Sequence, residues 1–391
     1  SVILLADALE NDWLVKKDKS IRIIDALCST GVRVRRWRNE IPKNLQGRMR
    51  ITANDLDEFA INWAKASHDE HPPATEINHS VESDRYGKVP EGEFDNGIYF
   101  QKLDARVALS ESSFQWVDLD PFGSPVPFLD AAIQSLSRVG FLEVTATDTA
   151  ALTGSSLSSQ KRRYGAKGIV DLYAHDDAVR TLMGLIATTA AKHDKTILPV
   201  LALFDGHHVR ISVMLKSSKE LASSIHTNIG WRIRCDDIPY RFKHHPNENE
   251  LDRSSGPMWI GPLWNKEITQ RITEQRALDL CYPSKEEYKL AKDCGLDWDE
   301  SDLEYAKREI IRSVKYISNA ADIMSRDHLL VSLDSLPKWS NTSGAPKIDT
   351  LIETIKQKGH FAARVPDLEP MIATDIDFNE LIKIVQDLKK D

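Results

Sequence analysis

Short apolar runs alternate with amphipathic stretches along the first 216 residues of the chain. Seven of these runs combine β-branched and aromatic residues between polar turn residues, which is the pattern of β-strands. The predicted strands cover residues 21–26, 50–54, 97–103, 114–119, 140–146, 197–204 and 209–215. Apolar residues at helical spacing between most of them predict helices over 32–39, 57–66, 128–139 and 171–192.

The order of these elements predicts the fold. Strands that alternate with helices form a mainly parallel sheet, because each helix crosses over to the next strand. Only Asp205-Gly206-His207 separates the last two predicted strands, so we expect a hairpin and an antiparallel last strand. A doubly wound sheet closed by a hairpin is typical of class I methyltransferases. We therefore predict an α/β, Rossmann-like methyltransferase domain with a seven-stranded sheet over residues 1–216.

The alternation weakens after residue 216, where we predict a second α/β domain over residues 217–391. Its predicted helices cover 217–227, 283–292, 301–321, 348–359 and 378–388, and one short strand covers 231–235. Two long insertions interrupt the first domain, over 71–96 and 152–168. Long loops inside a compact domain are usually functional, and the second insertion follows the fifth strand, where it could cover a substrate.

The turn after the fourth predicted strand carries the clearest chemical signal. It reads Asp120-Pro121-Phe122-Gly123, and open α/β sheets bind their ligands at this edge. The carboxylate can hold the hydrogens of an amine, the proline fixes the backbone, and the ring can stack on a base. The turn thus favours a methyltransferase that acts on an exocyclic base amine. The alternative is an ordinary capped turn, because Asp and Pro are common turn residues.

Acidic residues also end the first three predicted strands. Asp25 precedes a turn of small residues that leads to Gly31 and a helix, Asp55 could accept hydrogen bonds from two ribose hydroxyls, and Asp104 could accept one from an adenine amino group. Each acid alone could instead be a helix N-cap. Together with the single glycine and the absence of a Walker sequence, the three acids favour S-adenosylmethionine over NAD or a nucleotide. The candidate cofactor-binding residues are Asp25, Gly31, Arg33, Asp55, Asp104 and Ala105.

The composition of the chain limits the ligands and the cellular compartment that we expect for it. The net charge of −8 gives no global attraction for nucleic acid, so a binding surface must be local, with basic candidates at 33–38, 161–163 and 241–245. Four widely spaced cysteines predict neither a disulfide framework nor a bound metal such as structural zinc, and they indicate a reducing, cytoplasmic compartment. No apolar run reaches the ~18 residues of a membrane span. Because the sequence does not begin with Met, we expect it to start inside a longer chain.

Three segments together resemble one family, the tRNA guanine-26 N2-dimethyltransferases. They are the run from Val117 to Pro125, the run from Val144 to Gly154, and Arg163-Tyr164-Gly165. Asp25-Ala26-Leu27, Gly31-Val32-Arg33, Asn54-Asp55 and Gly261-Pro262-Leu263-Trp264 are also similar to that family. Many relatives have a cysteine cluster before the last of these segments, whereas Cys235 stands alone here.

The resemblance implies transfer of one or two methyl groups from S-adenosylmethionine to the N2 amine of a guanine in tRNA. It further implies a class I catalytic domain and a C-terminal domain that helps to hold the tRNA. The residues we assign to the reaction are Asp120, Pro121 and Phe122, with Asp120 as the acceptor for the amine. The sequence shows no obligatory protein partner.

Three other functions fit parts of the pattern. A methyltransferase for adenine N6 or for another RNA guanine would also use an Asp-Pro-aromatic turn, but Phe122 and the Thr147-Asp148-Thr149 segment favour the guanine-26 family. An RNA-binding protein without turnover would not need Asp120 and three cofactor acids. An NAD-dependent oxidoreductase is disfavoured by the single glycine of the first turn.

Overall fold

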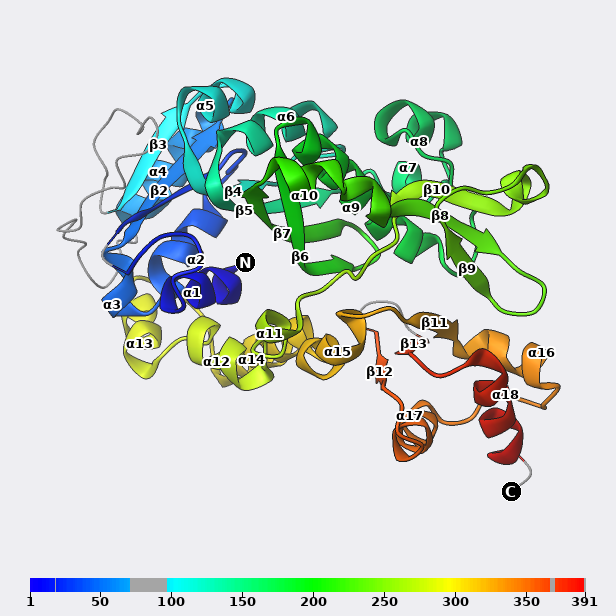
Figure 1. Cartoon of the computed structure of the whole chain (residues 1–391). Coiled ribbons are helices and arrows are strands. Elements are labelled where there is room, and N and C mark those ends of the chain that lie inside the picture. Colours follow the sequence, from blue (N-terminus) through cyan, green and yellow to red (C-terminus); the bar gives the residue numbers. More distant parts are fainter. Residues whose placement is uncertain (18, 71–96, 366–369, 390–391) are drawn as a thin grey trace. The chain divides into compact units, whose positions relative to one another are not determined.

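The computed structural model describes residues 1–17, 19–70, 97–365 and 370–389 (Figure 1). The insertion predicted over 71–96 lies outside the described residues. The chain forms two compact units, each assembled from three stretches. The first comprises Ser1–Thr145, Ser212–Ser218 and Ile272–Lys315, and the second comprises Ala146–Ile211, Lys219–Arg271 and Tyr316–Asp391. The domain boundary expected after residue 216 remains a prediction.

All seven predicted strands are present in one sheet. They are β1 (Ile21–Asp25), β2 (Met49–Asp55), β3 (Ile98–Lys102), β4 (Phe114–Leu119), β5 (Leu136–Ala146), β6 (Lys195–Phe204) and β7 (Val209–Ser217), in the order β3-β2-β1-β4-β5-β7-β6. The pairs β1–β2, β1–β4, β2–β3 and β4–β5 are parallel. The backbone N–H of Asp205 donates to the carbonyl of His208 at 3.2 Å, and so short a connection joins antiparallel neighbours.

The central strands are buried on both faces. Every residue of β1 and β4 is buried, as expected where helices cover both sides of a parallel sheet. Helices α2 (Val32–Glu40) and α4 (Glu58–Glu70) pack against β2, and α6 (Val126–Ser135) packs against β4. Trp116 of β4 stacks on Phe141 of β5 with ring centroids 4.0 Å apart. This packing fixes the edge at which β1, β2, β3 and β4 end.

Helix boundaries depart from the predictions at α6. We predicted a helix over 128–139, but α6 ends at Ser135 and Leu136 already belongs to β5. Leu136 pairs with Phe114 of β4, so pairing with the neighbouring strand overrides the local helical pattern. The helices α1 (Val2–Glu10), α3 (Lys43–Gln46), α5 (Ala105–Glu111), α11 (Lys266–Thr269) and α12 (Glu274–Cys281) were not predicted.

The predicted helix over 301–321 was also wrong as one element. It is divided into α14 (Glu300–Val314) and α15 (Ile317–Met324), because Tyr316 has a φ of 70° that no right-handed helix accepts. The predicted helix over 217–227 is α10 (Lys219–Ser223) followed by a 3₁₀ turn (Ile225–Asn228). The insertion over 152–168 is not a plain loop, since it contains α8 (Leu157–Tyr164) after the end of α7 (Thr149–Leu152). The predicted helix over 283–292 is confirmed as α13 (Lys285–Asp293).

The second unit is built around α9 (Ala174–Lys192), which packs against β10 (Ser254–Trp259). Strand β10 pairs with β8 (Ile229–Arg234), and β8 pairs with β9 (Tyr240–Lys243), in an antiparallel sheet. A Cβ added to Gly184 of α9 would lie 2.9 Å from the backbone nitrogen of Trp259, so glycine permits this close approach. Buried Arg232 of β8 binds both carboxylate oxygens of Asp177 at 2.7 Å.

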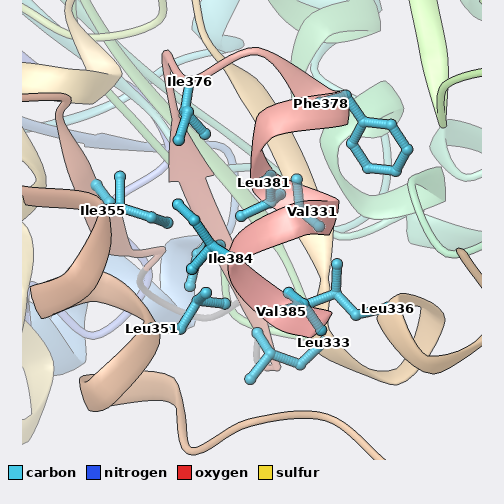
Figure 2. Close-up of a cluster of buried hydrophobic side chains, with 12 residues drawn as sticks. Val331, Leu333, Leu336, Leu351, Ile355, Ile376, Phe378, Leu381, Ile384 and Val385 are labelled. Carbon is cyan, nitrogen blue, oxygen red and sulfur yellow. The ribbon is translucent and has the colours of Figure 1, made fainter. Parts of the chain in front are cut away.

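A second small sheet of this unit carries the apolar cluster drawn in Figure 2. Strands β11 (Leu329–Ser332), β13 (Met371–Thr374) and β12 (Ala362–Arg364) are antiparallel. Helices α17 (Ile348–Gln357) and α18 (Phe378–Asp387) contribute Leu351, Ile355, Leu381 and Ile384 to the cluster. These two helices confirm the predictions over 348–359 and 378–388. Among the described helices, none has the length and apolar character needed to cross a lipid bilayer.

Candidate active site

Three carboxyl groups lie side by side across the centre of the sheet. Asp25 of β1 is the register partner of Asp118 of β4, and Asp118 is the partner of Glu143 of β5. All three side chains are buried. Buried carboxylates need compensating partners, and Glu143 accepts hydrogen bonds from the hydroxyls of Ser1 at 2.6 Å and Ser212 at 3.1 Å.

Arg33 of α2 supplies the positive charge beside this row of acids. Its Nη1 pairs with Asp118, and its Nη2 donates to Oδ2 of Asp120 at 2.5 Å. Burial lowers the pKa of the guanidinium, but Asp118, Asp25, Asp120 and Glu143 outweigh it and raise that pKa. Arg33 therefore stays charged and fixes the orientation of the Asp120 carboxylate.

The carboxyl group of Asp25 has a strongly raised pKa. Burial raises the pKa of Asp25 to about 7, Arg33 opposes this rise, and Asp118 and Asp120 add to it. The backbone N–H of Leu27 donates to its Oδ1 at 3.4 Å. The pKa of Asp25 therefore lies well above that of an ordinary aspartate.

The Asp-Pro-Phe-Gly turn exposes one side chain and buries another. Phe122 is 100% exposed, whereas Pro121 is buried. Gly123 has a φ of 82°, a conformation that favours glycine. The ring of Phe122 thus stands free beside the carboxylate that Arg33 orients.

At the end of β2, two polar residues bridge the neighbouring strand ends. Asp55 accepts hydrogen bonds from the backbone N–H groups of Ser29 at 2.9 Å and Asp57 at 3.0 Å. The Asn54 amide donates to the carbonyls of Ala26 and Leu103. Its Oδ1 is buried and has no hydrogen-bond partner within the described ranges. An unsatisfied acceptor of this kind is a place for a ligand donor.

Gly31 and Asp104 also have structural roles, in helix packing and in helix capping. Gly31 has a φ of 72°, and a Cβ there would lie 2.8 Å from the Cβ of Ala64 on α4, so helix packing also requires the glycine. Asp104 caps α5 and binds Arg106, whose side chain and backbone N–H lower the pKa of Asp104 to about 2. The next residue, Ala105, is buried in the first turn of α5. The cofactor roles of these residues remain predictions.

Sequence reasoning missed Asp118 and Glu143 as parts of the site. Each is a charged residue between apolar neighbours in a buried strand, in the runs Val117-Asp118-Leu119 and Leu142-Glu143-Val144. An acid at such a position needs a partner, and that signal could have identified both residues.

In the second unit, the Thr147-Asp148-Thr149 segment is hydrogen-bonded to side chains of α8. Asp148 accepts hydrogen bonds from the hydroxyl of Tyr164 at 2.5 Å and from Nη1 of Arg163 at 2.9 Å. Lys161 and Arg162 of the same helix are exposed. The basic stretch 161–163 therefore keeps exposed cations.

The other two basic stretches differ from that expectation. In 33–38, Arg38 is buried and donates to Gln46, and Arg36 pairs with Glu40. This stretch is therefore not one exposed basic face, because the alternation along α2 turns its arginines in different directions. In 241–245, Arg241 pairs with Asp237 and Lys243 pairs with Glu250.

The strand order, with β7 inserted between β5 and β6, defines a class I methyltransferase fold, and the Asp-Pro-Phe turn lies at its ligand-binding edge. Residues 2–386 match the family model described as N2,N2-dimethylguanosine tRNA methyltransferase. The chain belongs to this family.

Individual relatives agree with the family match. The chain is 31% identical over 371 residues to a protein of Methanospirillum hungatei, covering 92% of this chain and 83% of that one. It is 27% identical over 373 residues to a protein of Thermococcus kodakarensis, covering 94% and 87%. Both relatives are named tRNA (guanine(26)-N(2))-dimethyltransferase. The fold is similar to that of Pyrococcus horikoshii Trm1, solved with S-adenosyl-L-methionine, at a TM-score of 0.70 and 22% identity over 98% of this chain and 91% of that one.

Proposed function

We propose that this chain transfers one or two methyl groups from S-adenosylmethionine to the N2 amine of guanine 26 in tRNA. Membership of the family and the names of the relatives support this reaction and this substrate. The observation that carries it in the structure is the Asp120 carboxylate, held by Arg33 beside the exposed ring of Phe122.

The strand ends offer acceptors that suit this cofactor. S-adenosylmethionine carries ribose hydroxyls, an adenine amino group and an ammonium group, all of which donate hydrogen bonds. Asp55 would hold the ribose, and the unsatisfied Oδ1 of Asn54 is an acceptor at the same edge. Asp25, Gly31 and Arg33 would form the turn around it, with Asp104 and Ala105 near the adenine. When bound, the cofactor supplies an electrophilic methyl group on its sulfonium.

The residues of the turn prepare the guanine for transfer. The N2 lone pair is delocalised into the ring, so the amine is a weak nucleophile. Asp120 accepts a hydrogen bond from N2 as positive charge develops there, and it can accept the proton that is lost. Phe122 stacks on the base and Pro121 keeps the turn rigid, so the amine is held in line for attack.

Bringing guanine 26 to this turn requires the base to leave its stack, at a cost of a few kcal/mol. Phosphate contacts elsewhere must offset that cost. The exposed Lys161 and Arg162 of α8 supply such contacts, together with the rest of the second unit. The four free thiols agree with a reducing compartment, and we place the protein in the cytoplasm.

The test uses the full-length protein, unmodified tRNA and S-adenosylmethionine, followed by nuclease digestion and mass spectrometry of the nucleosides. The expected products are N2-methylguanosine and N2,N2-dimethylguanosine. A matched tRNA with adenine at position 26 is the control and should remain unmethylated. Formation of N6-methyladenosine, or no methylation of the guanine-26 tRNA, would contradict the proposal.

A further inference from the structure

The second unit contains a cavity that the proposed reaction does not use. Its volume is about 320 Å³, within the range of small-molecule sites. Its walls come from five parts of the chain: α9, the end of the 3₁₀ turn Ile225–Asn228, β9 with the residue after it, the Ile260-Gly261-Pro262 segment, and the turn that follows α15. None of its lining residues belongs to the site around Asp25 and Asp120.

His328 lines this cavity, and one of its ring nitrogens is an unsatisfied acceptor. Its Nδ1 lies 2.8 Å from the carbonyl oxygen of Arg326, and only a protonated ring nitrogen can donate to a carbonyl. The proton therefore sits on Nδ1, and Nε2 carries a lone pair. Nε2 is buried and has no hydrogen-bond partner in the described part of the chain. Burial, with Arg180 adding to it, lowers the pKa of His328, which keeps the ring neutral.

His244, which is exposed and also lines the cavity, makes a similar contact to a backbone carbonyl. Its Nδ1 lies 3.2 Å from the carbonyl oxygen of Ile229, so its Nε2 is an acceptor too. Two such histidines could indicate a metal ion. However, the described residues contain no group of three or more His, Cys, Asp or Glu that could hold one. The two lone pairs instead call for a ligand that donates hydrogen bonds, such as a sugar hydroxyl or a base amine.

Arg326 gives the cavity a binding group for an anion. Its Nε donates to the carbonyl of Asp322 at 3.1 Å, its Nη2 pairs with the Asp322 carboxylate, and its guanidinium lies 4.1 Å from the ring centre of Phe361. These contacts fix the plane of the guanidinium. Its Nη1 has no hydrogen-bond partner among the residues that the structure describes, so it can bind a phosphate oxygen.

The remaining wall is aromatic and apolar. Phe242 lines the cavity with Ile260 and Pro262. Arg180 lies over the Phe242 ring at 4.7 Å and is itself held by Asp176 and the carbonyl of Gly261. Arg180 thus supports the wall and has its charge compensated. A flat, partly apolar group fits such a surface.

We propose that this cavity binds one ribonucleotide, with its phosphate on Arg326, a hydroxyl or amine on His328 Nε2, and its base against Phe242. The nucleotide belongs to the tRNA substrate, outside the methylated guanine. This inference rests on the proposed function for the identity of the RNA. A free mononucleotide has the same chemistry, and the experiment separates the two sources.

The experiment measures tRNA affinity by fluorescence anisotropy for the full chain and for the variants Arg326→Gln and His328→Leu. We expect each variant to bind tRNA roughly 5- to 20-fold more weakly, while affinity for S-adenosylmethionine is unchanged. For Arg326→Gln, the slope of log affinity against log salt should fall by about one, since one phosphate contact is lost. Thermal melts show whether each variant is folded, and the two variants remove different contacts.

Arg253→Gln is the matched control. Arg253 is in the same unit, its side chain is 44% exposed against 40% for Arg326, and it also pairs with one aspartate. We expect its tRNA affinity to stay within twofold of the original chain. An equal loss in this control and in Arg326→Gln would overturn the proposal, because the effect would then be one of general charge.

Calorimetric titration with adenosine and uridine 5′-monophosphates completes the test. If mononucleotides bind and His328→Leu abolishes this while tRNA affinity is unchanged, the cavity binds a free nucleotide. If tRNA affinity is unchanged and no mononucleotide binds, the cavity proposal is wrong. The unaltered chain is assayed for guanine-26 methylation separately. Failure there contradicts the proposed function and is distinct from failure of the cavity.

Discussion

Nη2 of Arg33 lies 2.5 Å from Oδ2 of Asp120, although the two residues are 87 positions apart in the chain. The same guanidinium pairs with the buried Asp118 through its other nitrogen. A cation anchored in the sheet thus holds the carboxylate that we assign to the guanine amine. This arrangement preorganises the acceptor before the substrate arrives.

Asp120→Asn should lower the methylation rate without unfolding the protein. The substitution keeps the size of the side chain but removes the negative charge that stabilises the developing positive charge on N2. We expect the single-turnover rate on tRNA to fall by roughly two orders of magnitude or more. Affinity for S-adenosylmethionine should change little. The exposed Asp69→Asn on α4 is the control, and near-normal turnover of Asp120→Asn with a lowered melting temperature would exclude the catalytic assignment.

Phe122→Ala should lower kcat/KM for the tRNA substrate without lowering the melting temperature. The ring is 100% exposed, so its removal takes nothing from the core. Stacking on a base is worth about 1–3 kcal/mol, which corresponds to a fall in kcat/KM of roughly 5- to 150-fold. Steady-state kinetics beside thermal melts give both quantities. Phe59 is also an exposed aromatic residue and lies on α4. The control Phe59→Ala should leave kcat/KM unchanged, and an equal loss in this variant would contradict the stacking role of Phe122.

Asp55→Ala should reduce affinity for S-adenosylmethionine by several-fold or more, because it removes charge-assisted hydrogen bonds to the ribose. The side chain also accepts from Ser29 and Asp57, so the neighbouring turn loses two contacts. Asp57→Ala is the control, since Asp57 accepts from the backbone N–H of Phe59 at the start of α4. Calorimetry that finds unchanged affinity for Asp55→Ala would remove this residue from the cofactor site.

Because its pKa is raised in the folded state, Asp25 should make the free energy of unfolding fall as the pH rises toward neutrality. The folded chain holds the Asp25 proton up to about pH 7, whereas the unfolded chain releases it near its ordinary pKa of 3.8. Between these values the native state binds more protons, so the free energy of unfolding falls with rising pH, by up to about 1.4 kcal/mol per pH unit. Asp25→Asn removes this component. Urea unfolding across pH 4–7 should therefore show a flatter profile for the variant, and an unaltered profile would refute the raised pKa.

Arg232→Gln should strongly destabilise the second unit. Asp177 is buried against Arg232 and would be left without its cation. Loss of one partner of a buried pair costs about 3–5 kcal/mol. Arg234→Gln is the control, because Arg234 is 55% exposed and lies 3.9 Å from Asp171, where a loss below about 1 kcal/mol is expected. Urea unfolding of both variants measures the difference, and equal effects would contradict the importance of burial.

The periodicity of the sequence predicted the sheet well and several helices poorly. Strands such as β1 and β4 are short, continuous apolar runs, and that signal is strong because both faces are buried. Helix α6 was predicted to end four residues too late, since residues 136–139 lie in β5, which pairs with β4. The break at Tyr316 was missed because an aromatic residue rarely has a positive φ.

The candidate site was predicted in part. Asp25, Asp55 and Asp120 were predicted as site residues because each lies at the end of an apolar strand, and parallel strands end at one edge; their roles remain predictions. The ion pairs of Arg33 with Asp118 and Asp120 were not predicted, because they join side chains from different βα units. The same holds for the His328 cavity, whose walls come from five separate parts of the chain.

The sequence by itself determined the order of the seven strands along the chain, the Asp-Pro-Phe turn and the family, because these depend on local pattern and on motifs of adjacent residues. The tertiary structure alone decided which charges meet. Register across β1, β4 and β5 brings Asp25, Asp118 and Glu143 into one row. Burial there raises the pKa of Asp25 and requires the nearby charge of Arg33. Desolvation and charge pairing depend on distances through space, and spacing along the chain does not encode them.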